Sequence, residues 1–118
     1  MYWNQIVRFH RNPPSIKIKR SPRIQEEYNI YLSNPQNIIK LRENLFRNNY
    51  WELRPNDFPY YFADNTKCYV LWCQLPLDYN GIEFIIQNYT DFQDYIYFIN
   101  ERNNKSIHSI FHAHIFVK

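Results

Sequence analysis

Two histidines, His112 and His114, lie two residues apart in the C-terminal segment SIFHAHIFVK. On a β-strand, alternate side chains point to the same face of the sheet, so the two imidazoles would lie about 6.5 to 7 Å apart. Ile110 and Phe116 would share that face, and the apolar side chains between them would face the core. The pair is therefore the first candidate for chemistry in this chain.

Three interpretations of the pair stay open. Two histidines at this spacing can share a metal ion if a carboxylate or a thiolate completes the shell, but Asp57 or Asp64 would have to approach through the fold. The alternation of histidine and apolar residue also resembles the strand of the histidine-triad nucleotide hydrolases, which carry a third histidine where this chain has Phe116. In the structural interpretation, both imidazoles make hydrogen bonds on a half-exposed sheet face. We assign no residue to a metal, and the sequence leaves any cofactor unknown.

The second candidate is the segment WELRPNDFPYYF, residues 51–62, whose two prolines and Asn-Asp pair predict a shaped loop. Asp57 in this loop can accept backbone N–H groups in an Asx turn. On a rigid loop beside a pocket, the same carboxylate can instead orient a histidine or a substrate hydroxyl. Both roles remain open from the sequence.

Other polar and thiol side chains point to structural roles. Ser106 lies near His108 and His112, but it lacks the glycine-flanked turn of an activated serine, so turn capping is its commoner role. Cys68 and Cys73 would lie about 16 Å apart on one strand, too far for a disulfide. Reduced thiols favour a cytoplasmic protein.

The composition is that of one soluble globular domain. The chain has 118 residues, of which 45% are hydrophobic and 21% charged, and no apolar run is long enough to cross a membrane. Gly81 is its only glycine, which excludes a glycine-rich phosphate loop. The frequent Asn, Ile and Tyr residues fit an AT-rich genome, such as that of a large DNA virus or an AT-rich microbe.

Positive charge is concentrated at the N-terminus. The net charge is +3, and six cations precede the first acidic residue, Glu26: Arg8, Arg11, Lys17, Lys19, Arg20 and Arg23. Residues 1–20 contain Pro13 and Pro14 and predict an extended basic arm, with a short edge strand possible over SIKIK. Such an arm can bind nucleic acid or another polyanion, or it can pack beside the acidic remainder.

The rest, residues 21–118, predicts a single α+β domain. Ser21-Pro22 and Asn34-Pro35 are helix starts, and the apolar spacing after each predicts a helical hairpin. A third helix begins at Gly81. Strands are predicted over 67–75, 95–100 and 109–118. This order indicates an N-terminal helical hairpin packed on one face of a small mixed sheet.

Three segments, in order, resemble a eukaryotic family of unknown function typified by the fungal N-acetylglucosamine-induced protein. The family's Arg-Ser-Pro helix is similar to IKRSPRIQEEYNIYL, its central Asn-Asp-aromatic-Pro-Tyr motif and strand to LRPNDFPYYFADNTKCYVLWCQLPLD, and its C-terminal His-X-His strand to YIYFINERNNKSIHSIFHAHIFVK. The resemblance covers most of the chain from Lys19 onward. The matching positions are Arg20, Ser21, Pro22, Asn56, Asp57, Pro59, Tyr60, Trp72, Phe98, Asn100, Ser106, His112 and His114.

The resemblance implies a small-molecule site but no established reaction. We expect Asp57, His112 and His114 to be its catalytic residues, and further side chains to bind the ligand: Asn56, Tyr60, Trp72, Asn100 and Ser106. The family has a histidine where this chain has Cys68, and an acidic residue where it has Phe111, which puts a family activity in doubt here.

Two function hypotheses follow from the sequence. The first is a nucleotide or sugar-phosphate site, with phosphoester or phosphoanhydride hydrolysis if the protein is an enzyme. The second is a non-catalytic interaction protein that binds a host protein or nucleic acid through the basic arm. The sequence indicates no oligomeric state.

Overall fold

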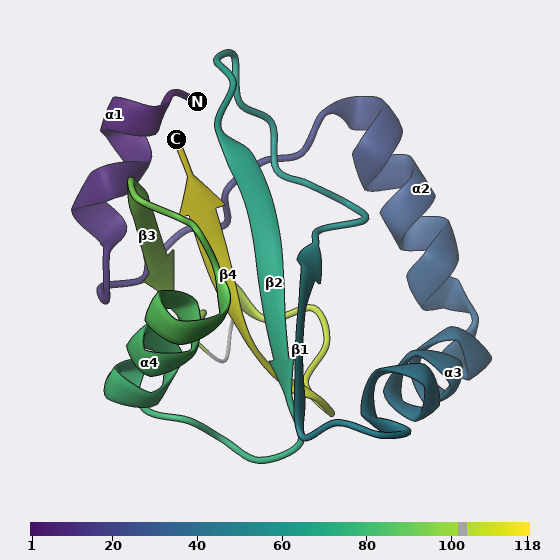
Figure 1. Ribbon diagram of the computed structural model, residues 1–118. Coiled ribbons are helices and arrows are strands. Elements are labelled where there is room, and N and C mark those ends of the chain that lie inside the picture. The colour runs from purple at the N-terminus through teal and green to yellow at the C-terminus, as the bar shows by residue number, and fades with distance from the viewer. Residues whose placement is uncertain (102–103) are drawn as a thin grey trace.

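A computed structural model describes residues 1–101 and 104–118, which form an α+β domain as expected (Figure 1). Helices are α1 (Trp3–Ile6), α2 (Pro22–Ser33), α3 (Pro35–Phe46) and α4 (Tyr79–Tyr89), and a 3-10 turn, η1, covers Val7–Phe9. Strands are β1 (Trp51–Pro55), β2 (Lys67–Cys73), β3 (Tyr95–Phe98) and β4 (Phe111–Val117). Within the described residues, no helix is long and apolar enough to cross a membrane.

The sheet is antiparallel throughout rather than mixed. Its strand order is β1-β2-β4-β3, and each neighbouring pair runs in opposite directions. In the central pair, Trp72 lies opposite His112 and Val70 opposite His114. The register therefore fixes which side chains of β2 flank the two histidines.

Helices cover both faces of the sheet, not one face as expected (Figure 1). Ile82, Ile85 and Ile86 of α4 pack on the face formed by alternate residues such as Leu71 and Ile115. The hairpin of α2 and α3 packs on the other face, where Leu45 joins a cluster around Val70, Trp72, Ile107 and Ile110. The predicted alternation along β4 is confirmed, but both of its faces are buried.

Side-chain caps begin the three longer helices. The predicted starts of α2 and α3 are confirmed, because Ser21 Oγ accepts from the backbone N–H of Ile24 and Asn34 Oδ1 from that of Gln36. Helix α4 begins two residues before Gly81, because Asp78 is its cap and accepts from the Gly81 N–H at 2.8 Å. The aspartate in LPLD was the better start signal.

The N-terminal segment is part of the core and not an extended arm. Residues 3–9 are helical, and the Ile6 side chain has 0% exposure in a cluster with Ile96, Phe98 and Phe116. The backbone N–H of Arg11 donates to the Tyr97 carbonyl at 2.8 Å, and the Tyr97 N–H donates to His10 Nδ1 at 3.2 Å. These bonds occupy the open edge of β3. Residues 15–20 are irregular, and no strand forms over SIKIK.

Strand β1 lies in the segment that was predicted as loop. Trp51 and Leu53 face the α4 cluster, and Glu52 and Arg54 alternate with them. Pro55 ends the strand at the sheet edge, where a missing N–H breaks no ladder bond. The two prolines and the Asn-Asp pair favoured a loop, although the four residues WELR alternate between apolar and charged side chains as a strand does. Only residues after Pro55 form the predicted loop.

Candidate functional site: a cavity over the histidine strand

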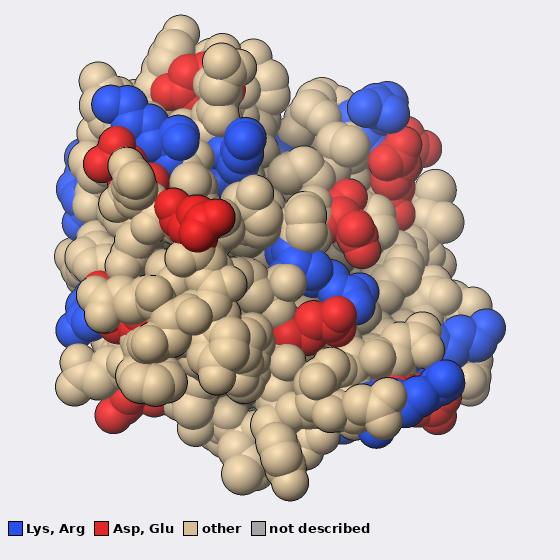
Figure 2. Space-filling model, in the orientation of Figure 1, with Lys and Arg blue, Asp and Glu red and all other residues tan. Residues whose placement is uncertain are grey.

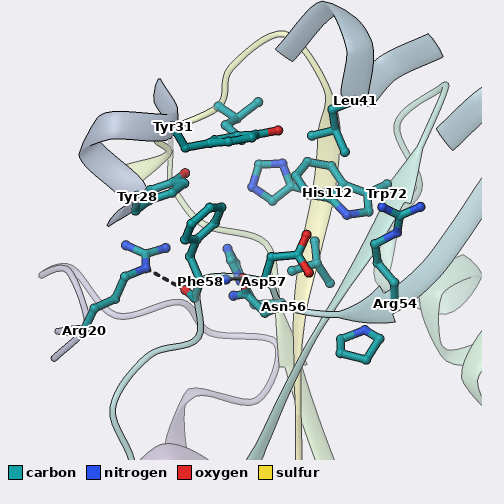
Figure 3. A pocket seen from close by; sticks show the side chains of 14 residues that line it. Arg20, Tyr28, Tyr31, Leu41, Arg54, Asn56, Asp57, Phe58, Trp72 and His112 are labelled. Carbon is teal, nitrogen blue, oxygen red and sulfur yellow. Dashed lines mark hydrogen bonds between the residues drawn. The ribbon is translucent and has the colours of Figure 1, made fainter. Parts of the chain in front are cut away.

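A cavity of about 50 Å³ lies between the sheet and the helical hairpin, over the histidine face of β4 (Figure 3). Helices α2 and α3 form one wall, the central strands form the floor, and the loop after β1 closes one side. The residues that line it are Arg20, Tyr28, Tyr31, Leu41, Arg54, Pro55, Asn56, Asp57, Phe58, Val70, Trp72, Ile107, His112 and His114.

Both histidines line this cavity, and both are buried, with 6% exposure each. Their ring centroids lie 5.3 Å apart in an edge-to-face arrangement. The Trp72 ring packs on His112 at 4.8 Å, and the Tyr60 ring packs on His114 at 5.4 Å. The shared face is confirmed, but the half-exposed environment is wrong, because the hairpin and the 56–62 loop cover that face.

The His112 ring has a fixed tautomer. Its Nδ1 lies 2.8 Å from the backbone carbonyl of Ile110. A carbonyl oxygen only accepts, so Nδ1 carries the proton and donates, and the neutral ring keeps a lone pair on Nε2. Burial is the main cause that lowers the pKa of His112. At neutral pH, Nε2 is therefore an unprotonated base or nucleophile on the cavity floor.

His114 has an unmet hydrogen-bonding group. Its Nδ1 is buried and has no partner among the described residues. Burial first, then the nearby His112 and Arg20, hold the pKa of His114 well below its usual value, so the ring is neutral. An unpaired buried polar atom costs about 1–3 kcal/mol, a cost that a bound ligand or water would remove. His114 also lines the cavity, so a polar ligand bound there would lie beside a histidine with an unmet hydrogen-bonding group.

Asn56, and not Asp57, makes the Asx turn of the loop. Asn56 Oδ1 accepts from the backbone N–H of Phe58 at 2.9 Å, and the Phe58 ring packs against Tyr28 and Tyr31 at 5.0 and 5.1 Å. Asp57 is left exposed, with its carboxylate on the His112 side of the cavity (Figure 3). No hydrogen bond joins Asp57 to either histidine in the described residues. The Ile110 carbonyl orients His112 instead.

Two guanidinium groups flank the cavity. The Arg20 guanidinium lies between the Tyr28 and Tyr60 rings, at 4.2 and 4.6 Å from their centroids. Its Nε donates to the Phe58 carbonyl at 2.7 Å, and its other nitrogens have no partner among the described residues. Arg54 forms an ion pair with Glu52 at 2.8 Å, and both side chains are partly exposed. Glu52 already neutralises Arg54, so Arg20 is the group that favours an anionic ligand.

The predicted site residues do not share one hollow. Asn56 and Trp72 line the cavity, whereas Tyr60 and Ser106 line a larger cleft beside it. Asn100 lies next to Tyr60, where its side chain opposes the rise in the Tyr60 pKa that burial causes. Arg20 and Tyr28 line both hollows and so join them.

The sequence reasoning missed the cationic and aromatic wall of the cavity. Arg54 lies in β1, which was predicted as loop. The alternation of apolar and charged residues in WELR is the pattern that indicates a strand there. Tyr28 and Tyr31 were identified only as apolar positions of a helix. Within residues 1–101 and 104–118, no three His, Cys, Asp or Glu side chains converge to hold a metal ion.

Comparisons with known proteins give a likeness of fold. No protein-family model matches the sequence, and no curated protein matches it either. The crystal structure of HTC1 is similar, with a TM-score of 0.62 and 19% sequence identity. The match covers 85% of this chain and 75% of HTC1. At this identity the two chains share a fold.

Acid should destabilise the protein through three histidines. Burial lowers the pKa of His10, His112 and His114, so the unfolded chain binds protons more readily than the folded one below about pH 6.5. We expect the free energy of unfolding, measured by urea titration, to be full above pH 7 and to fall progressively toward pH 5. Asparagine at both His112 and His114 should flatten this dependence, and His108→Asn, an exposed control, should preserve it. A pH-independent free energy would contradict the neutral, buried state of these rings.

Proposed function

We propose that the cavity binds the phosphoryl group of a small molecule, such as a nucleotide or sugar phosphate, and that the protein hydrolyses its phosphoester or phosphoanhydride bond. The observation that carries this proposal is the state of His112. Its Nδ1 is anchored on Ile110, its Nε2 keeps a lone pair, and the ring lines a cavity that Arg20 also lines. Neutral imidazole near a fixed guanidinium suits attack on phosphorus.

The size of the cavity limits what enters it. A cavity of about 50 Å³ has room for a few water-sized groups and is small beside ligand pockets of about 300–1,000 Å³. A phosphoryl group fits this limit. The remainder of the ligand then lies outside the cavity.

The reaction has two steps. His112 Nε2 bonds to phosphorus, the bond from phosphorus to the leaving oxygen breaks, and the leaving oxygen takes a proton from water. A second water attacks the phosphohistidine, the P–N bond breaks, and inorganic phosphate leaves. The proton that this water releases neutralises the hydroxide left by the first step. His112 is then neutral again, and its Nδ1 still donates to the Ile110 carbonyl.

A thermal-shift screen tests the binding step, since a ligand that binds only the folded state raises the melting temperature. We expect inorganic phosphate, nucleoside monophosphates and sugar phosphates at millimolar concentration to raise it by a few degrees. The matching nucleosides and free sugars are the controls and should leave it unchanged. Equal shifts with phosphorylated and unphosphorylated compounds, or none with either, would contradict the proposal.

Membership of the family typified by the fungal N-acetylglucosamine-induced protein is part of this proposal. Its support is that Asn56, Asp57, Trp72 and the two histidines line one cavity, although they lie far apart in the sequence. The departures at Cys68 and Phe111 fall outside the cavity lining. Phe111 packs toward α4, on the opposite face from the histidines. Neither departure therefore removes a cavity side chain.

An interaction protein remains the alternative proposal. Lys17 and Lys19 are exposed next to two exposed apolar side chains, Ile16 and Tyr61. Other cations are engaged, since Arg11 donates to the Tyr97 hydroxyl and Arg20 is held by Phe58. Figure 2 shows positive and negative side chains interspersed over the visible face. Salt-sensitive nucleic-acid binding that is lost on neutralising these lysines would favour this alternative.

A further inference from the structure

We infer that the ligand carries two adjacent phosphoryl groups, as in a nucleoside diphosphate, and that the bond broken is the phosphoanhydride between them. The inference rests on the proposed function. The terminal phosphoryl group occupies the histidine cavity. The second group lies in the neighbouring cleft, on the other side of Arg20.

The neighbouring cleft is large and basic. Its volume is about 610 Å³, within the range of small-molecule sites. Three of its lining residues are cations and none is acidic: Lys17, Ile18, Lys19, Arg20, Pro22, Gln25, Tyr28, Asn29, Leu32, Tyr60, Asn104 and Ser106. It can therefore hold the larger part of a ligand that the cavity excludes, and its charge selects an anion.

Arg20 joins the two hollows. Its side chain lines both of them, as does that of Tyr28. The Tyr28 and Tyr60 rings hold the guanidinium between them, and the Phe58 carbonyl fixes Nε. The terminal nitrogens have no partner among the described residues, so they remain to donate to oxygens on either side. A guanidinium held in this way can bridge the oxygens of adjacent phosphoryl groups.

Lys17 and Lys19 give the cleft a role in the reaction. Both side chains are exposed, so they reach a ligand without breaking a contact in the core. When His112 Nε2 bonds to the terminal phosphorus, the bridging P–O bond breaks, and the new charge falls on the phosphate in the cleft. Cations next to that phosphate stabilise the leaving group. Water then hydrolyses the phosphohistidine and restores neutral His112. The products are inorganic phosphate and a monophosphate.

The test compares two nucleotides that differ by one phosphoryl group. We would titrate ADP and AMP calorimetrically into the wild type, the double variant Lys17→Gln/Lys19→Gln, and the charge-matched control Lys40→Gln/Lys118→Gln. We expect the wild type to bind ADP more tightly than AMP. The cleft variant should lose on the order of tenfold to a hundredfold in ADP affinity and less than about threefold in AMP affinity. The control variant should match the wild type.

The outcomes separate this inference from the proposed function. Equal losses for ADP and AMP in the cleft variant, or no loss for either, would overturn the second phosphoryl subsite. His112→Asn reports on the cavity itself. If wild type and His112→Asn release inorganic phosphate from ADP at the same rate, the proposed function fails as well. If only the wild type releases it, the function stands whatever the lysines do.

Discussion

His112→Asn should abolish turnover of a phosphorylated substrate and leave the fold intact. The amide N–H of asparagine replaces Nδ1 as donor to the Ile110 carbonyl, but no atom replaces the Nε2 lone pair. Loss of a nucleophile or base of this kind lowers kcat by roughly 10² to 10⁴. The rate is followed by release of inorganic phosphate, with His108→Asn as the control because His108 is exposed and does not line the cavity.

Asparagine is a better probe than alanine at this position. His112 is buried against the Trp72 ring, so alanine would leave a void and an unpaired Ile110 carbonyl and lower the melting temperature whatever the function. His112→Asn activity within twofold of the wild type, at equal stability, would contradict a chemical role for Nε2. A large loss of activity at unchanged melting temperature separates chemistry from packing.

Ile6→Ala should cost about 2–5 kcal/mol of unfolding free energy, a large share of the stability of a small domain. Ile6 is fully buried against Phe98 and Phe116, and the helix that carries it leads into the backbone bonds to Tyr97 at the edge of β3. Removal of its side chain leaves a cavity on the sheet and loosens the segment that covers that edge. Urea denaturation measures the change directly.

The matched control for Ile6→Ala is Ile16→Ala, in the same N-terminal segment. The Ile16 side chain is 76% exposed, so its removal should change the unfolding free energy by no more than about 0.5 kcal/mol. Equal and small effects of the two variants would show that the N-terminal segment is a dispensable arm, as its prolines and charges first suggested.

Local signals in the sequence predicted most of the elements. Capping residues and proline fixed the starts of α2 and α3, because a side-chain oxygen before proline satisfies the first backbone N–H groups of a helix. Helix α1 carried no such signal. It is held by the burial of Ile6 against Ile96, Phe98 and Phe116, which lie far along the chain and which no local pattern contains. Strand β1 was hidden because turn residues follow it directly.

The candidate site was predictable only in part, because local patterns indicate some of its features and long-range contacts determine the others. Period-two alternation placed His112 and His114 on one face, since it depends only on strand geometry. Their burial depends on the elements that cover that face, namely the hairpin and the 56–62 loop, and the register with Trp72 is set by long-range pairing. Arg20 lines both hollows because the Tyr28 and Tyr60 rings hold its guanidinium in place, and no spacing in the sequence relates these two residues to it.

The most direct test of the account is a long-range ¹H–¹⁵N spectrum of the histidine rings, recorded at pH 7 without and with inorganic phosphate. The account predicts that His112 is the Nδ1–H tautomer with an unprotonated Nε2, and that phosphate shifts the ring resonances of both His112 and His114 while those of His108 stay in place. A His112 ring protonated on Nε2, or cavity histidines that do not respond to phosphate, would contradict it.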